Sequence, residues 1–151
     1  MGLQVMIVGA GRVGSALAVE LADAGHQVTV LEQRPDRRDW LAAERQDIDV
    51  VLGDGIDPHV LEAHGARKCD VLVAVTDLDD TNVLIATIGK IEFEVPRTIT
   101  RIVDPRCGWL HIPAMGVDVA LEQASLIAGE KVTEGRLARR LSTFDAGMRS
   151  Y

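Results

Sequence analysis

The sequence predicts an α/β domain of the Rossmann type: a doubly wound, parallel, six-stranded sheet in the order 3-2-1-4-5-6 with helices on both faces. Two observations predict this fold. Short apolar runs alternate with longer amphipathic segments along the 151 residues, and strands that alternate with helices form a parallel sheet covered on both faces. The first apolar run also leads directly into a glycine-rich turn, residues 9–14, which opens the first amphipathic segment.

Each expected strand is a short apolar run bounded by turn-forming residues. The six strands are expected at residues 3–8, 27–31, 48–52, 71–75, 97–103 and 117–121. The run from Val71 to Val75 is apolar on both faces, as a central strand of a covered parallel sheet should be.

The helices are expected where apolar residues recur at helical spacing. They cover residues 15–24, 35–45, 57–63, 79–90 and 125–144, with a short helix or irregular turn at 105–114. Gly25 is well placed to end the first helix, and Pro35 suits the first turn of the second. We therefore expect one domain at residues 1–144 and a frayed tail at residues 145–151. The last helix could cover the sheet edge or a second subunit.

Composition and charge narrow the class of protein. The net charge of −7 and the isoelectric point near 5.0 argue against nucleic-acid binding, because phosphate contacts need a basic face. The two cysteines form no C-x-x-C pattern, which argues against a disulfide framework and a cysteine-type zinc site. No run approaches the roughly 18 apolar residues of a membrane-spanning helix, and no secretory signal is visible. We expect a cytoplasmic location without direct membrane insertion.

A nucleotide-binding loop is predicted between the first strand and the first helix, at Gly9-Ala10-Gly11-Arg12-Val13-Gly14. The first glycine permits a tight turn, the second lets the backbone approach a pyrophosphate, and the third lets the helix pack against the strand. The helix N-terminus adds free N–H groups and a partial positive charge that favour phosphates. A tight strand-to-helix turn without a ligand is the alternative.

Glu32, at the end of the second strand, predicts which nucleotide is bound. It lies 18 positions after Gly14, where a carboxylate accepts hydrogen bonds from ribose hydroxyls and repels the 2′-phosphate of NADP. This favours NAD(H) or an adenine nucleotide such as ATP or ADP. The nearby Arg34, Arg37 and Arg38 count against this interpretation, since an arginine there can accept a 2′-phosphate.

Arg12, at one of the non-glycine positions of the loop, is a candidate phosphate-binding residue. A guanidinium at a helix start adds a charged, forked donor toward phosphate. It could flank the pyrophosphate of a dinucleotide or reach the terminal phosphate of ATP or ADP. A surface arginine that points into water is the alternative.

Further polar candidates follow the other strands, because ligands of this fold bind outside the carboxyl ends of the strands. The candidates are Gly53 and Asp54 after the third strand, Thr76, Asp77 and Asn82 after the fourth, and Arg101 late in the fifth. Asp54 is equally compatible with a turn, and Asp79 and Asp80 are typical helix-capping residues. Arg101 could face a partner subunit instead of the crevice.

The sequence does not indicate an enzyme. A short-chain reductase needs a tyrosine and a lysine one helical turn apart, but the only tyrosine is Tyr151. The four histidines show no paired metal spacing, so we expect surface or capping histidines, no metal site and no catalytic residues. No G-x-S-x-G nucleophile motif is present. A small NAD-dependent oxidoreductase with its partner domain elsewhere is the alternative.

An ordered series of motifs covers residues 3 to 121. Beside the glycine loop and Glu32, it consists of Gly53-Asp54-Gly55, Asp70-Val71-Leu72-Val73-Ala74-Val75-Thr76, Asp79-Asp80-Thr81-Asn82, Arg101-Ile102-Val103-Asp104-Pro105 and Gly116-Val117-Asp118. This series resembles the N-terminal nucleotide-binding domain of the Trk/Ktr-type regulators of potassium transport, known as the TrkA-N, RCK or KTN domain. The segment Cys107 to Pro113 does not align with that family's pattern.

The resemblance implies a cytoplasmic regulator that binds NAD(H) or ATP/ADP and controls a potassium channel or transporter, peripheral to the inner membrane through that partner. Domains of this family pair and often assemble into rings, so it also implies a homodimer or higher ring assembly. Carried over residue by residue, the ligand-binding positions are Gly9, Ala10, Gly11, Arg12, Val13, Glu32, Gly53, Asp54, Thr76, Asp77 and Arg101. Family members often carry a second, C-terminal domain. The regulatory domain of a cation/proton antiporter would look almost identical and is the alternative.

Overall fold

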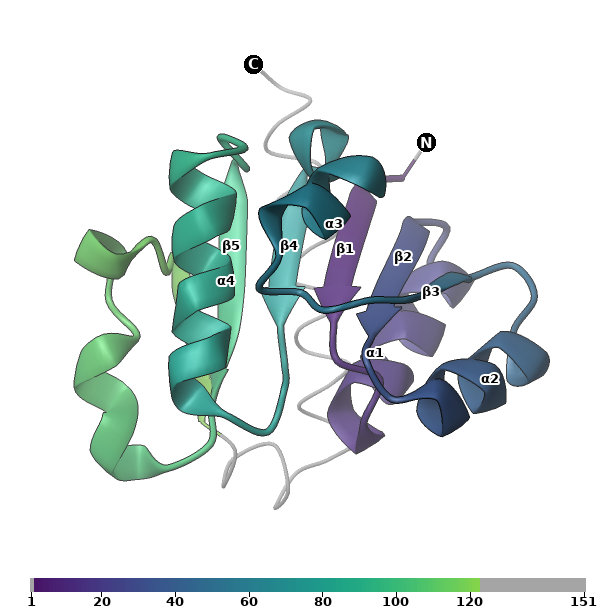
Figure 1. Ribbon diagram of the computed structural model, residues 1–151, viewed down its shortest axis with the longest axis horizontal. Helices are drawn as coiled ribbons and strands as arrows, with labels where there is room; N and C mark the ends of the chain where they lie inside the picture. The colour runs from purple at the N-terminus through teal and green to yellow at the C-terminus, as the bar shows by residue number, and fades with distance from the viewer. Residues whose placement is uncertain (1, 123–151) are drawn as a thin grey trace.

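The computed structural model describes residues 2–122, which build a six-stranded sheet (Figure 1). The strands are β1 (Gln4–Val8), β2 (Gln27–Glu32), β3 (Asp49–Leu52), β4 (Val71–Ala74), β5 (Arg97–Ile102) and β6 (Val119–Glu122). They lie in the order β3-β2-β1-β4-β5-β6, and every neighbouring pair is parallel. The predicted Rossmann-type sheet is therefore confirmed.

Helical segments connect consecutive strands of this sheet. The α-helices are α1 (Arg12–Asp23), α2 (Pro35–Glu44), α3 (Pro58–Ala63) and α4 (Asp79–Ile91), and the 3₁₀ turns are η1 (Ala66–Lys68), η2 (Pro105–Leu110) and η3 (Pro113–Met115). The irregular segment expected at 105–114 thus consists of two short 3₁₀ turns. The helix predicted at 125–144 and the tail at 145–151 lie outside the described residues.

Two boundaries differ from the prediction by more than one residue, for physical reasons. Helix α1 begins at Arg12 rather than Ser15, because the carbonyl of Gly11 already accepts the Ser15 N–H at 2.9 Å and the glycine loop supplies the first helical turn. The sixth strand begins at Val119 rather than Val117. Val117 is buried in a small apolar cluster with residues of α4, and its N–H donates to Ile112 at 3.2 Å instead of joining the sheet.

The two faces of the sheet carry separate apolar cores, because successive side chains of a strand point to opposite faces. Ile7 of β1 belongs to the core under α1 and α2, whereas its neighbour Met6 belongs to the core under α3 and α4. Figure 1 shows α3 and α4 in front of the sheet and α1 behind it. The prediction of helices on both faces is confirmed.

The carboxyl ends of the central strands position the glycine loop. Val8 ends β1 between Leu31 of β2 and Ala74 of β4. From there the chain turns toward β2, and its Gly9 N–H donates to the Leu31 carbonyl at 2.9 Å. The loop therefore opens at the point where the strand order reverses, which is where ligands bind in sheets of this kind.

Two histidines are buried rather than on the surface, although His111 is also the C-cap residue of η2, so the prediction of surface or capping histidines was wrong for His26. His26 is 8% exposed, and its Nδ1 accepts the N–H of Leu3 at 2.9 Å. His111 is 6% exposed and contacts Thr100 and Asp79 through its two ring nitrogens, at 2.7 and 2.9 Å. These partners lie far away in sequence, so no local spacing pattern marked them.

Three further observations apply to residues 2–122 alone. Each helix there falls short of the length and apolar content needed to cross a membrane. No group of three or more His, Cys, Asp or Glu side chains in this part of the chain could hold a metal ion. Both cysteines, Cys69 and Cys107, are free thiols.

Candidate functional site

The first and third glycines of the loop are required by the backbone itself. Gly9 has a φ of 111°, and a Cβ there would lie 2.9 Å from the carbonyl oxygen of Val75. A Cβ at Gly14 would lie 1.8 Å from the carbonyl oxygen of Gly9. Real side chains avoid both situations. These two glycines therefore let β1, the loop and α1 pack directly on one another.

Gly11 differs from the other two glycines because only the end of one flexible side chain approaches the space beside it. The nearest atom to a Cβ built at Gly11 is Nη2 of Arg34, at 3.7 Å. Gly11 also precedes α1 as its N-cap residue, no side chain caps the helix there, and the first turn of α1 holds no acidic residue. A helix N-terminus of this kind favours anions, so the space beside Gly11 suits a phosphate group.

A pocket of about 340 Å³ opens beside the glycine loop at the carboxyl ends of β1, β2, β3 and β4. Of the predicted site residues, the lining contains Gly9, Gly11, Glu32, Gly53, Asp54, Thr76 and Asp77. The structure thus brings residues from four separate strand ends to one pocket.

The other predicted residues lie around this pocket rather than in its lining. Arg12 is exposed and lines a neighbouring depression between α1 and α2, which we call the α1–α2 groove. The groove is lined by Gly11, Arg12, Ser15, Ala16, Val19, Glu20, Arg34, Arg37, Trp40, Leu41, Glu44, Arg45 and Asp77. The residues outside both linings are Ala10, Val13, Gly14, Asn82 and Arg101.

Glu32 is a buried carboxylate with several donors. Its Oε1 accepts the N–H of Ala10 at 3.1 Å, and the Arg34 guanidinium pairs with it at 2.8 Å. Burial raises the pKa of Glu32, but the hydrogen bonds from the side chain and N–H of Arg34 and the N–H of Ala10 lower the pKa below its ordinary value. Glu32 is therefore a carboxylate anion at neutral pH and can accept hydroxyl donors.

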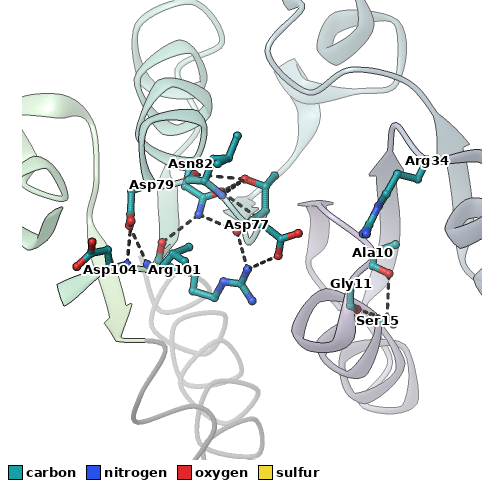
Figure 2. A network of polar contacts seen from close by, with 12 residues as sticks. Ala10, Gly11, Ser15, Arg34, Asp77, Asp79, Asn82, Arg101 and Asp104 are labelled. Carbon is teal, nitrogen blue, oxygen red and sulfur yellow. Dashed lines mark hydrogen bonds and ion pairs between the residues drawn. The ribbon is translucent and has the colours of Figure 1, made fainter. Parts of the chain in front are cut away.

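A second polar network holds the loop after β4 (Figure 2). Asn82, fully buried in α4, accepts the N–H of Thr76 at 2.9 Å and donates to the carbonyl oxygens of Thr76 and Arg101 at 3.2 and 3.0 Å. Nη2 of Arg101 donates to the Thr76 carbonyl at 2.6 Å and pairs with Asp77 at 3.1 Å. Asn82 and Arg101 thus hold Thr76 and Asp77, which are among the residues of this loop that line the pocket.

Asp79 anchors the outer part of this region. Its carboxylate accepts the N–H groups of Val103 at 2.8 Å and Asp104 at 2.9 Å and contacts Nε2 of His111 at 2.9 Å. Burial raises the pKa of Asp79, but these hydrogen bonds and the His111 ring lower it below its ordinary value. Asp79 therefore ties the N-terminus of α4 to the segment after β5 rather than capping its own helix.

Comparison with known proteins identifies the family. A family model described as the TrkA-N domain matches residues 5–122. This chain belongs to the TrkA-N domain family. The Trk system potassium uptake protein TrkA of Mycobacterium tuberculosis is 39% identical over 140 residues, which are 91% of this chain and 63% of that protein. The chain therefore spans less than two thirds of the length of this relative.

Solved structures share the fold of this TrkA-N domain. The TrkA-N domain of the inner membrane protein ybaL from Escherichia coli has a TM-score of 0.74 at 19% identity, over 88% of this chain and 96% of that one. The GsuK channel bound to NAD has a TM-score of 0.69 at 20% identity, over 80% of this chain and 21% of the channel chain. The Kef CTD from Shewanella denitrificans, in AMP-bound form, has a TM-score of 0.69 at 21% identity, over 96% of this chain and 94% of that one.

Sequence reasoning missed the apolar part of the TrkA-N pocket. Ile56, Leu78 and Ile85 line it together with Thr81, and the first two side chains are 40% and 61% exposed. A signal was present: Ile56 follows the polar turn Gly53-Asp54-Gly55 after β3, and Leu78 follows the polar pair Thr76-Asp77 after β4. Apolar side chains at this edge provide a surface on which a flat ring can pack.

Proposed function

We propose that this TrkA-N domain is a regulatory module that binds NAD(H) or ATP/ADP and thereby controls a potassium channel or transporter. The observation that carries the proposal is the pocket that joins the open side of Gly11 to the carboxylate of Glu32. A phosphate fits the first position and ribose hydroxyls fit the second. The apolar side chains of Ile56, Leu78 and Ile85 complete the pocket with a surface for the base.

The remaining predicted residues support these contacts in our proposal. Ala10 and Val13 contribute backbone to the loop and the first turn of α1, and Arg12 extends from that turn toward the phosphates. Asn82 and Arg101 hold Thr76 and Asp77 against the pocket. Two proteins of similar fold, the GsuK channel bound to NAD and the Kef domain bound to AMP, bind nucleotides of the proposed class.

The experiment that tests this proposal is a calorimetric titration of the 151-residue chain with NAD, NADH, NADPH, ATP, ADP and AMP. We expect saturable binding of NAD(H) or ATP/ADP and weaker binding of NADPH, because Glu32 repels a 2′-phosphate. At a hundredfold excess over the dissociation constant, a bound nucleotide should stabilise the fold by about 2.7 kcal/mol. Absence of binding by every nucleotide at millimolar concentration would overturn the proposal.

Gly11→Ala is expected to weaken binding of the preferred nucleotide about tenfold or more, because the methyl group occupies the space into which the phosphate must come. The free energy of unfolding should stay unchanged, since the backbone of Gly11 is extended (φ −73°, ψ −164°) and the nearest atom to the new methyl is 3.7 Å away. Calorimetry and urea unfolding measure the two effects. Unchanged affinity would show that no phosphate lies at Gly11.

Arg12→Ala is expected to weaken ATP binding about tenfold more than AMP binding, because a guanidinium at the start of α1 adds a charged donor for the terminal phosphates. The comparison between the two nucleotides is the internal control, since both share the adenosine half. Competition titrations on one preparation of the variant measure the ratio. Equal loss for ATP and AMP would remove a terminal-phosphate role for Arg12.

Control of transport is the second half of the proposal. We propose that copies of the domain pair, as a homodimer or in a ring, on the cytoplasmic side of a membrane protein, and that nucleotide binding favours one arrangement. The 39% identity with a Trk potassium uptake protein supports a potassium channel or transporter as the partner. Co-purification of the tagged chain from native membranes tests this, and recovery without any potassium transporter would contradict it.

Regulation of a cation/proton antiporter is a second candidate function, supported by the similarity to the Kef domain over 94% of that chain. The same co-purification distinguishes the two partners. Catalysis is not part of the proposal, because the lining of the pocket within residues 2–122 contains no His, Cys, Lys or Tyr side chain. Steady oxidation of NADH with a small carbonyl substrate would instead support an oxidoreductase.

A further inference from the structure

The carboxylate proposed to bind ribose is already occupied by a neighbouring side chain. Oε1 of Glu32 accepts the N–H of Ala10 at 3.1 Å and both Nε and Nη2 of Arg34, at 3.3 and 2.8 Å. Oε2 accepts the backbone N–H of Arg34 at 3.1 Å. With only 4% of Glu32 exposed, ribose hydroxyls can reach this carboxylate only if the Arg34 guanidinium gives up its place.

The space beside Gly11 lies close to the Arg34 guanidinium and can receive it after displacement. The Arg34 side chain is 47% exposed, so its movement disturbs little packing. It lines both the pocket and the α1–α2 groove, and its Nη2 already lies 3.7 Å from the Cβ position at Gly11, where a phosphate fits. Figure 2 shows Arg34 beside Ala10 and Gly11, across from Asp77 and Arg101.

The other acidic side chains of the pocket lining, Asp54 and Asp77, do not offer Arg34 an equivalent partner. Asp54 is exposed and accepts the N–H of Ile56, and Asp77 is 82% exposed and is already paired with the buried guanidinium of Arg101 at 3.1 Å. A pair between Arg34 and either exposed carboxylate would contribute little energy. The phosphate of a ligand at Gly11, by contrast, would meet Arg34 with two or more oxygens, and arginine pairs with phosphate in a bidentate way.

We propose that Arg34 makes this site selective for phosphorylated nucleotides over nucleosides, because only a ligand phosphate can replace Glu32 as its ionic partner. A nucleoside must break the Glu32–Arg34 pair and leaves the guanidinium without a new anion. A nucleotide breaks the same pair but supplies its phosphate in return. This inference rests on the proposed nucleotide-binding function and adds the residue that excludes nucleosides.

The test compares adenosine with ADP on the wild-type chain, Arg34→Ala and the matched control Arg38→Ala. The Arg38→Ala substitution also removes one positive charge. The Arg38 side chain, however, bonds to the Val50 carbonyl and to Asp39 and lines neither the pocket nor the α1–α2 groove. Arg34→Ala should bind adenosine about threefold more tightly, since no ion pair opposes it, and ADP about tenfold more weakly, since one charge-assisted phosphate contact is lost. Arg38→Ala should leave both affinities unchanged.

The outcomes of this calorimetric comparison separate the inference from the proposed function. An ADP-to-adenosine preference that falls about thirtyfold in Arg34→Ala alone supports the inference. Equal changes for both ligands, or no change, would overturn it while leaving nucleotide binding in place. A wild-type chain that binds neither of these ligands and also fails to bind NAD, NADH and ATP would overturn the proposed function itself. Cooperative urea unfolding of each of the three proteins without ligand would show that the variants are folded.

Discussion

Gly14→Ala is expected to lower the free energy of unfolding by about 3 kcal/mol. The new Cβ would lie 1.8 Å from the carbonyl oxygen and 2.9 Å from the carbonyl carbon of Gly9. Both atoms are backbone, and Gly9 is itself held by its N–H bond to Leu31 at 2.9 Å. Relief therefore requires α1 to move away from the sheet, with loss of its packing against β1.

Urea unfolding of Gly14→Ala beside Gly11→Ala measures this effect with a matched control. Both variants add one methyl group to the same loop, but only the one at Gly14 meets protein atoms closer than 3.7 Å. We expect a large loss of stability for Gly14→Ala and none for Gly11→Ala. Similar stability of the two variants would mean that α1 does not pack as closely on the loop as the structure indicates.

Asp79→Asn is expected to cost about 2 to 3 kcal/mol of stability at neutral pH. The Asp79 carboxylate accepts two backbone N–H groups, from Val103 and Asp104, and contacts His111. An amide has one acceptor oxygen, so its NH₂ group must face a backbone donor. The segment after β5 should then lose its anchor to α4. Asp80→Asn is the matched control, because the carboxylate of Asp80 is exposed and accepts the N–H of the neighbouring Thr81.

The stability difference between wild type and Asp79→Asn should also depend on pH. The pKa of Asp79 in the folded protein is below the ordinary value of 3.8, so the carboxylate stabilises the fold in its charged form. Its contribution is fully present above about pH 5 and is lost as the pH falls through 3.8 and then through the lowered folded pKa. Urea unfolding at pH 7 and at about pH 3 checks this. A difference that stays constant between these pH values would contradict the charged-carboxylate role.

The sequence predicted the architecture well because the signals for it are local. The alternation of apolar runs with amphipathic segments and the glycines at 9, 11 and 14 are properties of neighbouring residues, and sheet order follows from them through general rules of chain connection. Boundaries at Ser15 and Val117 were misplaced because backbone hydrogen bonds outside the apolar pattern set them. Motif order alone also indicated the TrkA-N family, which the family match over residues 5–122 confirms.

The candidate site was predictable only as a set of residues near one sheet edge. Spacing placed Thr76, Asp77, Asn82 and Arg101 there, but the sequence does not say which of them faces the pocket. The structure shows Thr76 and Asp77 in the lining and Asn82 and Arg101 outside it, because the buried amide and guanidinium donate to the backbone carbonyls of Thr76 and Arg101.

The sequence by itself therefore determined the fold, the glycine loop and the acidic strand end, since each depends on residues close together in the chain. Tertiary structure alone decided the partners of the buried polar groups. His111 meets Asp79 across 32 positions, and the Arg101 guanidinium meets the Thr76 carbonyl across 25. Such pairings depend on where separate loops meet in space, and a buried charge must find its partner there.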